Sequence, residues 1–115
     1  MNTTVFVYGT LKRGKENHGW IADQQFITEA RTAPLFRLHD LGGYPGLIRA
    51  AQNGVSVEGE LWSVTPEGLA RLDVLEDTAG GEYERVLIPL DSGDAVEAYL
   101  YLRDVSGRPD CGACW

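Results

Sequence analysis

The sequence is short of positive charge. It has 10 Lys and Arg against 17 Asp and Glu, which gives a formal net charge of −7 at pH 7. Binding to a nucleic-acid backbone or to an anionic membrane surface requires clustered Lys and Arg. We therefore expect neither nucleic acid nor a membrane as a partner, whereas a small anion held by backbone N–H groups is compatible with the acidic total.

Long apolar runs are also missing. No stretch approaches the roughly 20 apolar residues of a membrane-spanning helix, and residues 1–4 (Met-Asn-Thr-Thr) lack the basic and apolar regions of a secretory signal. We expect a cytoplasmic protein. The length of 115 residues predicts a single domain over residues 1–115, and a hydrophobic content of 43% is too high for a disordered chain.

Cysteine is confined to the end of the chain, where Cys111 and Cys114 form a CxxC pair. A redox CxxC normally follows a strand and precedes a helix, but here the sequence stops after Trp115. A metal site would need two more ligands, and neither His18 nor His39 has ligand spacing. We therefore expect no metal site and an irregular C-terminal tail over residues 104–115.

Short β-rich runs separated by glycine turns make up most of the chain. The predicted strands cover residues 3–8, 26–33, 35–38, 55–64, 83–90 and 95–102, the last two joined as a hairpin. Strands and helices do not alternate regularly, which argues against a doubly wound parallel sheet. The pattern predicts an α+β fold, with a small mixed β-barrel of about six strands flanked by one or two short helices.

Two helices are predicted. Thr65-Pro66-Glu67 is a typical helix start, with a capping Thr, Pro at the first helical position and an acid in the first turn. This helix should end near Glu76, ahead of the glycines at 80 and 81. Residues 17–24 predict a second, short helix, with Asn17 as its N-cap and Trp20 and Ile21 facing inward.

Residues 8–14 (Tyr-Gly-Thr-Leu-Lys-Arg-Gly) form the most informative stretch. A glycine directly after a buried strand allows close approach of a ligand, and successive N–H groups can then hold an anion such as a carboxylate. The segment from Gly9 to Lys15 also matches a P-loop, but Glu16 stands where Ser or Thr should reach Mg²⁺, so phosphate binding is not expected. An ordinary glycine turn with solvated Lys12 and Arg13 is the alternative.

The helix that ends near Glu76 carries the candidate acid/base. Leu69, Leu72, Asp73 and Glu76 share one helical face, so an acid falls beside an apolar stripe. Burial would raise the pKa of Glu76 and suit it to general acid/base chemistry. The alternative is a solvated Glu76 at a frayed helix end, and Asp73 is either a helper or a rim residue. Four other acids are expected to be surface charges: Glu58, Glu60, Glu67 and Glu82.

Tyrosines supply further candidates. Tyr83 and Tyr101 lie at strand ends and are candidate cavity hydroxyls, although a Tyr is more often a core residue with a satisfied hydroxyl. Residues 44–46 (Tyr-Pro-Gly) are either part of a cavity rim or, as the pattern favours, a plain turn.

Several segments, taken in order, resemble the gamma-glutamylcyclotransferase-like family. They are residues 8–14 with Asn17-His18, 43–45 (Gly-Tyr-Pro), 57–61 (Val-Glu-Gly-Glu-Leu), 72–76 (Leu-Asp-Val-Leu-Glu) and 83–85 (Tyr-Glu-Arg). The similarity runs from about Val5 to Tyr101 and is greatest to the gamma-glutamylamine cyclotransferases and their short bacterial relatives.

The resemblance implies a β-barrel with a cavity at one end and a reaction that needs no metal or organic cofactor. It implies that the loop of Tyr8, Gly9, Thr10 and Leu11 holds the α-carboxylate and amine side of a γ-glutamyl group, and that Glu76 is the acid/base. The expected reaction converts a small-molecule γ-glutamyl amide to 5-oxoproline and a free amine, through attack of the substrate's own α-amine.

Two readings from other classes stay open. The same cavity could serve a non-catalytic module that binds a small metabolite, in which case Glu76 should be solvated. Alternatively, exposed tryptophans at positions 20, 62 or 115 could dock a partner protein, which would require a contiguous apolar patch.

Overall fold

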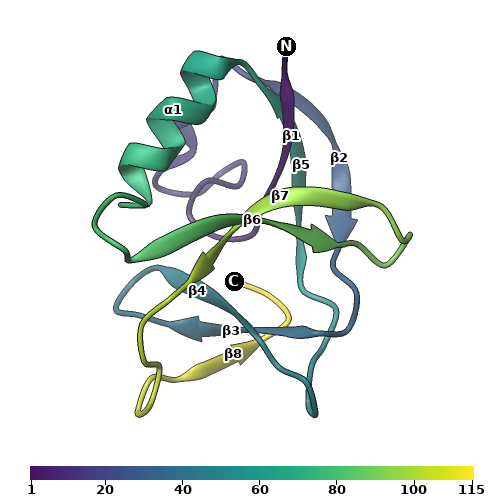
Figure 1. Ribbon diagram of the computed structural model, residues 1–115, viewed down its shortest axis with the longest axis vertical. Coiled ribbons are helices and arrows are strands. Elements are labelled where there is room, and N and C mark those ends of the chain that lie inside the picture. The colour runs from purple at the N-terminus through teal and green to yellow at the C-terminus, as the bar shows by residue number, and fades with distance from the viewer.

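Eight strands and one α-helix make up the fold in a computed structural model that describes residues 1–115 (Figure 1). The strand order in the sheet is β2-β5-β1-β7-β4-β3-β8, with β6 paired to β7. The strands are β1 (Thr3–Val7), β2 (Gln25–Arg31), β3 (Phe36–Asp40), β4 (Pro45–Arg49), β5 (Glu58–Val64), β6 (Tyr83–Pro89), β7 (Ala95–Tyr101) and β8 (Asp110–Gly112).

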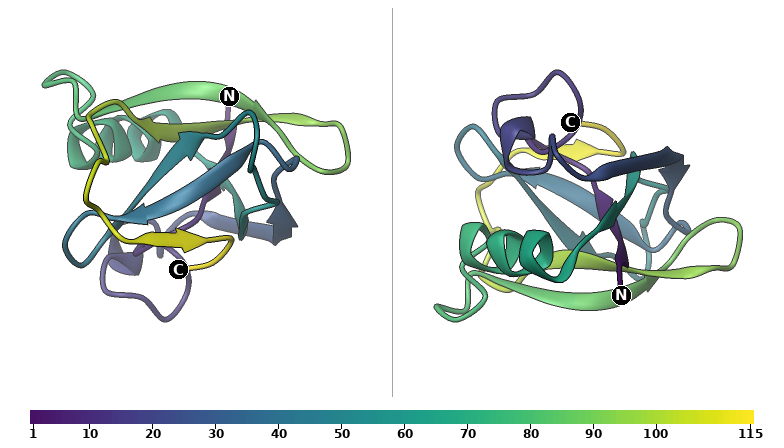
Figure 2. Two further views of the ribbon diagram at one scale, coloured as in Figure 1. Left: turned by 90° about the horizontal axis from the view of Figure 1, so that it is seen from below. Right: turned by 90° about the horizontal axis from the view of Figure 1, so that it is seen from above.

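The sheet curls into a partly open barrel, and α1 (Pro66–Leu75) lies against its outside (Figure 2). This confirms the predicted α+β barrel with a flanking helix, although the strands number eight rather than about six. No helix is long and apolar enough to cross a membrane.

Alternation along the strands divides the core in two, because successive strand residues point to opposite faces. On β1 and just beyond it, Phe6 and Tyr8 belong to the cluster inside the barrel, together with Leu38, Leu47 and Ile88. Val5 and Val7 belong instead to a second cluster, between the sheet and α1, which also contains Trp62, Leu72, Tyr83 and Tyr99. The helix is therefore fixed to the outer face of β1, β5 and β7 by a core of its own.

A split in the sheet lies beside β7. Strand β6 pairs antiparallel along the whole of one edge of β7, from Tyr83↔Tyr101 to Pro89↔Ala95. Strands β1 and β4 both pair parallel to β7, at Val5↔Glu97 and Leu47↔Leu100 respectively. Because β6 occupies one edge, β1 and β4 must share the other. Tyr99 lies on β7 between the two pairing points, where β1 ends and β4 begins.

Strand β4 was not expected, because Pro45 and Gly46 look like turn residues. Pro45 stands at the first position of the strand, where a missing N–H is tolerated. Gly46 packs closely, since a Cβ there would come within 2.9 Å of side-chain atoms of Leu41 and Tyr101. Both residues therefore serve the strand rather than interrupt it.

Both ends of α1 have well-formed caps. The Thr65 hydroxyl accepts the N–H of Gly68 at 3.1 Å, and Pro66 occupies the first turn, as the sequence predicts. At the other end the N–H groups of Asp77 and Thr78 donate to the carbonyls of Val74 and Asp73, both at 3.1 Å, while Asp77 has φ 54°. This is a Schellman motif, and it fixes Glu76 as the C-cap residue.

Residues 17–24 do not form the predicted short α-helix. Only His18–Trp20 is helical, as a 3₁₀ turn labelled η1, and Asn17 makes no side-chain cap. The Asn17 side chain instead donates from Nδ2 to the Thr10 hydroxyl at 2.9 Å. Ile21 is buried as expected, but Trp20 is 39% exposed, so its predicted inward orientation is wrong.

The C-terminal segment is more ordered than predicted. The expectation of an irregular tail over residues 104–115 is wrong for residues 110–112, which form β8 and pair with β3. The N–H of Glu58 donates to the carbonyl of Ala113 at 2.8 Å, and Trp115 packs against the barrel core. Backbone pairing and an apolar anchor at Trp115 hold this segment to the barrel, with Cys111 and Cys114 as free thiols.

Candidate functional site

A small cavity opens where β1 and β4 separate. Its volume is about 40 Å³. We call residues 8–17, which follow β1, the first loop. The cavity lining comes from this loop, the end of β1, the start of β4, the end of α1 and strands β6 and β7. It consists of Phe6, Val7, Tyr8, Gly9, Thr10, Leu11, Tyr44, Pro45, Glu76, Tyr83 and Tyr99. Neither Lys nor Arg is among these residues. The structure thus brings most of the predicted site residues to one place, namely the loop of residues 8–11, Glu76 and Tyr83.

Tyr101 is the predicted site residue that does not line the cavity. Its ring lies 5.3 Å from that of Tyr83, edge to face, and packs against the core beneath α1. A hydroxyl was expected here because Tyr101 ends a strand. The cavity hydroxyl on β7 belongs instead to Tyr99, two residues earlier on the same face of the strand. Residues two apart in a strand lie on the same face, and this periodicity could have identified Tyr99 as a candidate beside Tyr101.

Three consecutive backbone N–H groups are left unpaired in the first loop. Gly9, Thr10 and Leu11 come one residue after the end of β1, and none of their N–H groups donates a hydrogen bond within the protein. Backbone donors without partners are uncommon away from water, and several in succession favour an anion. The loop therefore presents three backbone donors at the cavity, of the kind that can hold a carboxylate.

Gly9 is required by packing rather than by an unusual backbone angle. A Cβ at this position would lie 2.4 Å from Cγ of Pro45, well inside contact distance. The first loop and the start of β4 therefore lie against each other, and any side chain at position 9 would push them apart at the cavity.

Hydrogen bonds from the start of the 3₁₀ turn η1 hold the first loop in place. Asn17 donates through Nδ2 to the Thr10 hydroxyl at 2.9 Å and through its backbone N–H to the Thr10 carbonyl, also at 2.9 Å. The His18 ring bonds through Nδ1 to the carbonyl of Leu11 at 3.0 Å. With its side-chain oxygen and its carbonyl both held, Thr10 has little freedom to reorient.

Glu60 anchors the other side of the loop. It is only 7% exposed, so its predicted place among the surface charges is wrong. Its carboxylate accepts the Arg13 backbone N–H at 3.1 Å, Arg13 Nε at 3.0 Å and Trp62 Nε1 at 3.1 Å. Burial alone would raise the pKa of Glu60, but the hydrogen bonds from Trp62 and Arg13 outweigh it and lower the pKa.

Glu76 has the opposite surroundings. It is half-buried in the cavity wall, and no donor of the protein bonds its carboxylate. Burial, assisted by the negative charge of nearby Glu82, raises its pKa from 4.5 to about 7. A carboxyl group of this kind exchanges protons readily near neutral pH. Glu76 is therefore not the solvated helix-end acid of the alternative reading.

Four tyrosines line the cavity, and three of them, Tyr8, Tyr83 and Tyr99, are buried. Tyr8 donates to the carbonyl of Tyr99 at 2.7 Å, Tyr83 to the carbonyl of Pro45 at 2.8 Å, and Tyr99 to Asp73 Oδ1 at 2.7 Å. Burial raises the pKa of each phenol above its ordinary value, and the charge of Glu76 adds to the effect in all three. The phenols therefore stay protonated and neutral.

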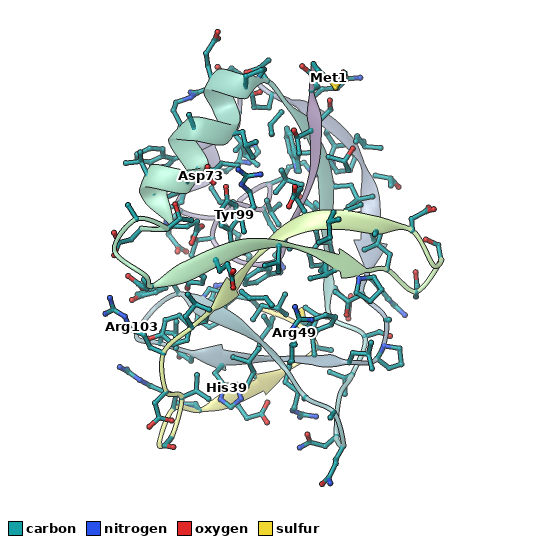
Figure 3. The ribbon with its side chains drawn as sticks, viewed as in Figure 1. Met1, His39, Arg49, Asp73, Tyr99 and Arg103 are labelled. Atoms are coloured by element: carbon teal, nitrogen blue, oxygen red, sulfur yellow. The ribbon has the colours of Figure 1, made fainter.

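Asp73 holds Tyr99 from the side of the helix. The two residues face each other across the gap between α1 and β7, as Figure 3 shows. Asp73 also accepts from Arg85 Nε at 3.0 Å and from Arg85 Nη2 at 3.3 Å, and Arg85 reaches Glu97 at 3.5 Å. Asp73 is thus a helper that fixes a cavity tyrosine, and it does not line the cavity itself.

Tyr44 and Pro45 form part of the cavity rim, so the plain-turn reading that the sequence favoured is wrong. Tyr44 is 39% exposed, and its hydroxyl donates to Glu82 at 3.1 Å. Pro45 is buried against the first loop. Tyr44 is therefore the outermost aromatic of the cavity lining.

A larger hollow lies away from Glu76. This open groove of about 530 Å³ runs along the outer side of the first loop and is lined by charges of both signs, among them Lys12, Lys15, Arg31, Glu58 and Asp91. Glu60, which also lines it, has a lowered pKa, whereas the cavity contains Glu76 with a raised pKa and is the better candidate for chemistry.

The tryptophans do not gather into a docking patch. Trp62 is 4% exposed and contacts the rings of His18 and Phe26, while Trp115 packs against the barrel core. Only Trp20 is exposed. The burial of the other two rings counts against an interaction surface built on them.

Comparison with known proteins identifies the family to which the chain belongs. Residues 5–113 match the sequence family described as gamma-glutamyl cyclotransferase, AIG2-like. The chain belongs to this family. It is 38% identical over 103 residues to the gamma-glutamylcyclotransferase family protein YtfP of Escherichia coli K12, an alignment that covers 90% of this chain and 86% of YtfP.

Solved structures agree with the assignment. A uropathogenic E. coli-specific protein superposes with a TM-score of 0.86 at 26% identity, covering 100% of this chain and 93% of the other. An AIG2-like protein of Mus musculus superposes with a TM-score of 0.72 at 31% identity, covering 89% and 77%. The family resemblance found in the sequence is therefore confirmed.

Proposed function

We propose that the protein is a cyclotransferase that converts a γ-glutamyl amide to 5-oxoproline and an amine, with Glu76 as general acid/base. The observation that carries the proposal is an acid without hydrogen-bond partners, with a pKa of about 7, in the lining of a cavity to which Gly9, Thr10 and Leu11, with their unpaired backbone N–H groups, also contribute. Family membership supports the reaction class, and the site chemistry supports the assignment of roles.

The α-carboxylate of the substrate would bind the N–H groups of Gly9, Thr10 and Leu11. No cation lines the cavity, so these dipoles are the groups suited to hold it. Holding the carboxylate at one end folds the substrate so that its α-nitrogen approaches its own γ-carbonyl. Because nucleophile and electrophile belong to one molecule, such positioning supplies much of the rate.

Glu76 would act as the general base and then as the general acid. The α-ammonium must lose a proton before its nitrogen can attack, and an ionised Glu76 accepts it. The new bond joins the α-nitrogen to the carbonyl carbon of the γ-glutamyl amide, and the bond from that carbonyl carbon to the amide nitrogen breaks. The α-nitrogen loses two protons on its way to the lactam N–H, and the departing nitrogen gains two and leaves as an ammonium ion. Positioned acid/base help of this kind contributes roughly 10²- to 10⁴-fold.

The cavity must widen to admit a substrate. Its volume of about 40 Å³ holds a few water molecules and is well below the roughly 300–1,000 Å³ usual for small-molecule sites. Tyr44 is exposed, and its hydroxyl has one partner, Glu82. We expect Tyr44 to turn outward on binding, since the rest of the lining belongs to the packed clusters, the first loop and the helix end.

The test is release of 5-oxoproline from a panel of γ-glutamyl amides that differ in the leaving amine, with Glu76→Gln as the matched variant. We expect release by the parent protein and loss of most of it in Glu76→Gln, which keeps the shape of the side chain. No release from any amide by folded parent protein would reject the reaction and favour a module that only binds a small metabolite.

A further inference from the structure

The hydroxyl protons of Tyr83 and Tyr99 are both donated to acceptors within the protein. The partner of Tyr83 is the carbonyl of Pro45 at 2.8 Å, and that of Tyr99 is Asp73 Oδ1 at 2.7 Å. A carbonyl only accepts hydrogen bonds, and Asp73 acts as an acceptor here because it also receives Arg85. Both tyrosines must therefore be donors to these partners.

Each of these two oxygens then keeps a lone pair. No N–H or O–H of the protein donates to the hydroxyl oxygen of Tyr83 or Tyr99, although both residues line the cavity and are almost fully buried. Tyr8 differs, because the backbone N–H of Leu47 lies near enough to its oxygen to oppose the rise in its pKa caused by burial. Tyr83 and Tyr99 are thus the buried cavity phenols with an unused acceptor, whereas Tyr44 is exposed at the rim.

The ligand group that matches these acceptors is one with several donors and positive charge. Glu76 lines the same cavity as both phenols, so its carboxylate is available to the same ligand group. An ammonium group has three donors and no acceptor. We propose that Tyr83, Tyr99 and Glu76 form a cradle that binds the α-ammonium group of the substrate.

The cradle complements the backbone donors that line the same cavity. The N–H groups of Gly9 to Leu11 are donors only, and the cradle consists of acceptors only, so together they match the carboxylate and ammonium carried by one α-carbon. The inference rests on the proposed function, because it assigns groups of the same substrate. It adds that Tyr83 and Tyr99 act by binding the ammonium, and that Asp73 positions Tyr99 for this purpose.

The test compares two ligands that differ only at the α-carbon. L-glutamine has the ammonium group, and 4-carbamoylbutanoate lacks it. Affinities are measured by calorimetry or NMR titration in the Glu76→Gln background, where turnover does not interfere, with and without Tyr99→Phe. Tyr101→Phe is the matched control, because Tyr101 lies beside Tyr83 but does not line the cavity.

We expect Tyr99→Phe to weaken L-glutamine binding by about tenfold or more, since a hydrogen bond to a charged group is lost, and to leave 4-carbamoylbutanoate within about twofold. Tyr101→Phe should change neither affinity. Equal loss for both ligands or no loss for either would overturn the cradle. If Glu76→Gln, which lacks one member of the cradle, does not bind L-glutamine, the comparison is made on the protein that keeps Glu76, and absence of L-glutamine binding there at millimolar concentration overturns the cradle. If Tyr99→Phe does not fold, Tyr83→Phe gives the same comparison.

The two proposals fail separately. Ammonium-dependent binding without release of 5-oxoproline would reject the reaction and keep the cradle. Release of 5-oxoproline without any preference for the ammonium ligand would reject the cradle and keep the reaction.

Discussion

Glu60 and Glu76 both lie within the packed part of the protein, but the groups around their carboxylates differ. Glu60 accepts three hydrogen bonds from Arg13 and Trp62, and its pKa is lowered. Glu76 accepts none, and burial beside Glu82 raises its pKa to about 7. The comparison shows that burial alone does not decide the role of an acid. A satisfied carboxylate holds structure together, and an unsatisfied one remains able to exchange a proton.

The largest effect is expected from Glu76→Gln on turnover. The substitution removes the proton acceptor and keeps the side-chain volume, so kcat should fall roughly 10²- to 10⁴-fold. Circular dichroism and urea unfolding at pH 8 should show an intact fold, because Glu76 makes no hydrogen bond that the Gln would lose. Turnover close to that of the parent would remove Glu76 from the role of acid/base.

The pH dependence of stability should have opposite signs for the two acids. The native pKa of Glu76 is above its ordinary value of 4.5, so the folded state holds the proton more tightly and loses stability as pH rises from about 4.5 to about 7. The loss is about 3 kcal/mol. Glu76→Gln should therefore become more stable than the parent above pH 7, as measured by urea unfolding at pH 5 and pH 8.5.

For Glu60 the native pKa is below its ordinary value of 4.5. Its stabilising contribution is present at neutral pH and is lost as pH falls through the native pKa. If Glu76→Gln showed the same difference from the parent at both pH values, the raised pKa of Glu76 would be contradicted.

Glu60→Gln should destabilise the protein and weaken substrate binding together. The variant loses the charge facing Arg13 and one acceptor oxygen, which costs about 1–3 kcal/mol of unfolding free energy. Because Glu60 anchors the backbone of Arg13 next to the unpaired N–H groups, KM should rise severalfold, with a smaller change in kcat. Urea unfolding and steady-state kinetics on the best amide measure the two effects.

Thr65→Ala separates loss of stability from weaker substrate binding, and it has the smallest predicted effect. It removes the N-cap of α1 at the end far from Glu76 and should cost about 1 kcal/mol. KM and kcat should stay at parental values. A rise in KM as large as that of Glu60→Gln would mean that lost stability, and not the anchoring of the first loop, explains the Glu60 result.

Features set by neighbouring residues could be predicted from the sequence. Thr65 and Pro66 predict the start of α1, and the β6–β7 hairpin follows from alternation around a glycine turn. The position of Glu76 beside an apolar stripe also depends on helix periodicity alone. These features need no knowledge of distant residues.

Features set by distant contacts could not be predicted in the same way. Glu60 is buried because Arg13, 47 residues earlier in the chain, closes over it. Strand β8 forms because residues 110–112 pair with β3. Asn17 does not cap a helix because its side chain donates a hydrogen bond to Thr10 instead. Tyr99 joins the site only because β1 and β4 separate beside it. In each case the role of the residue depends on a contact with a distant part of the chain, and sequence spacing does not identify that contact.

The most direct test is the pH profile of kcat/KM for 5-oxoproline release from the best γ-glutamyl amide, by the parent and by Glu76→Gln. The base form of Glu76 is needed, so the parent profile should rise with pH through an apparent pKa of about 7. This limb should be absent from the residual activity of Glu76→Gln. A profile in which the same limb persists without Glu76 would contradict the assignment of the acid/base.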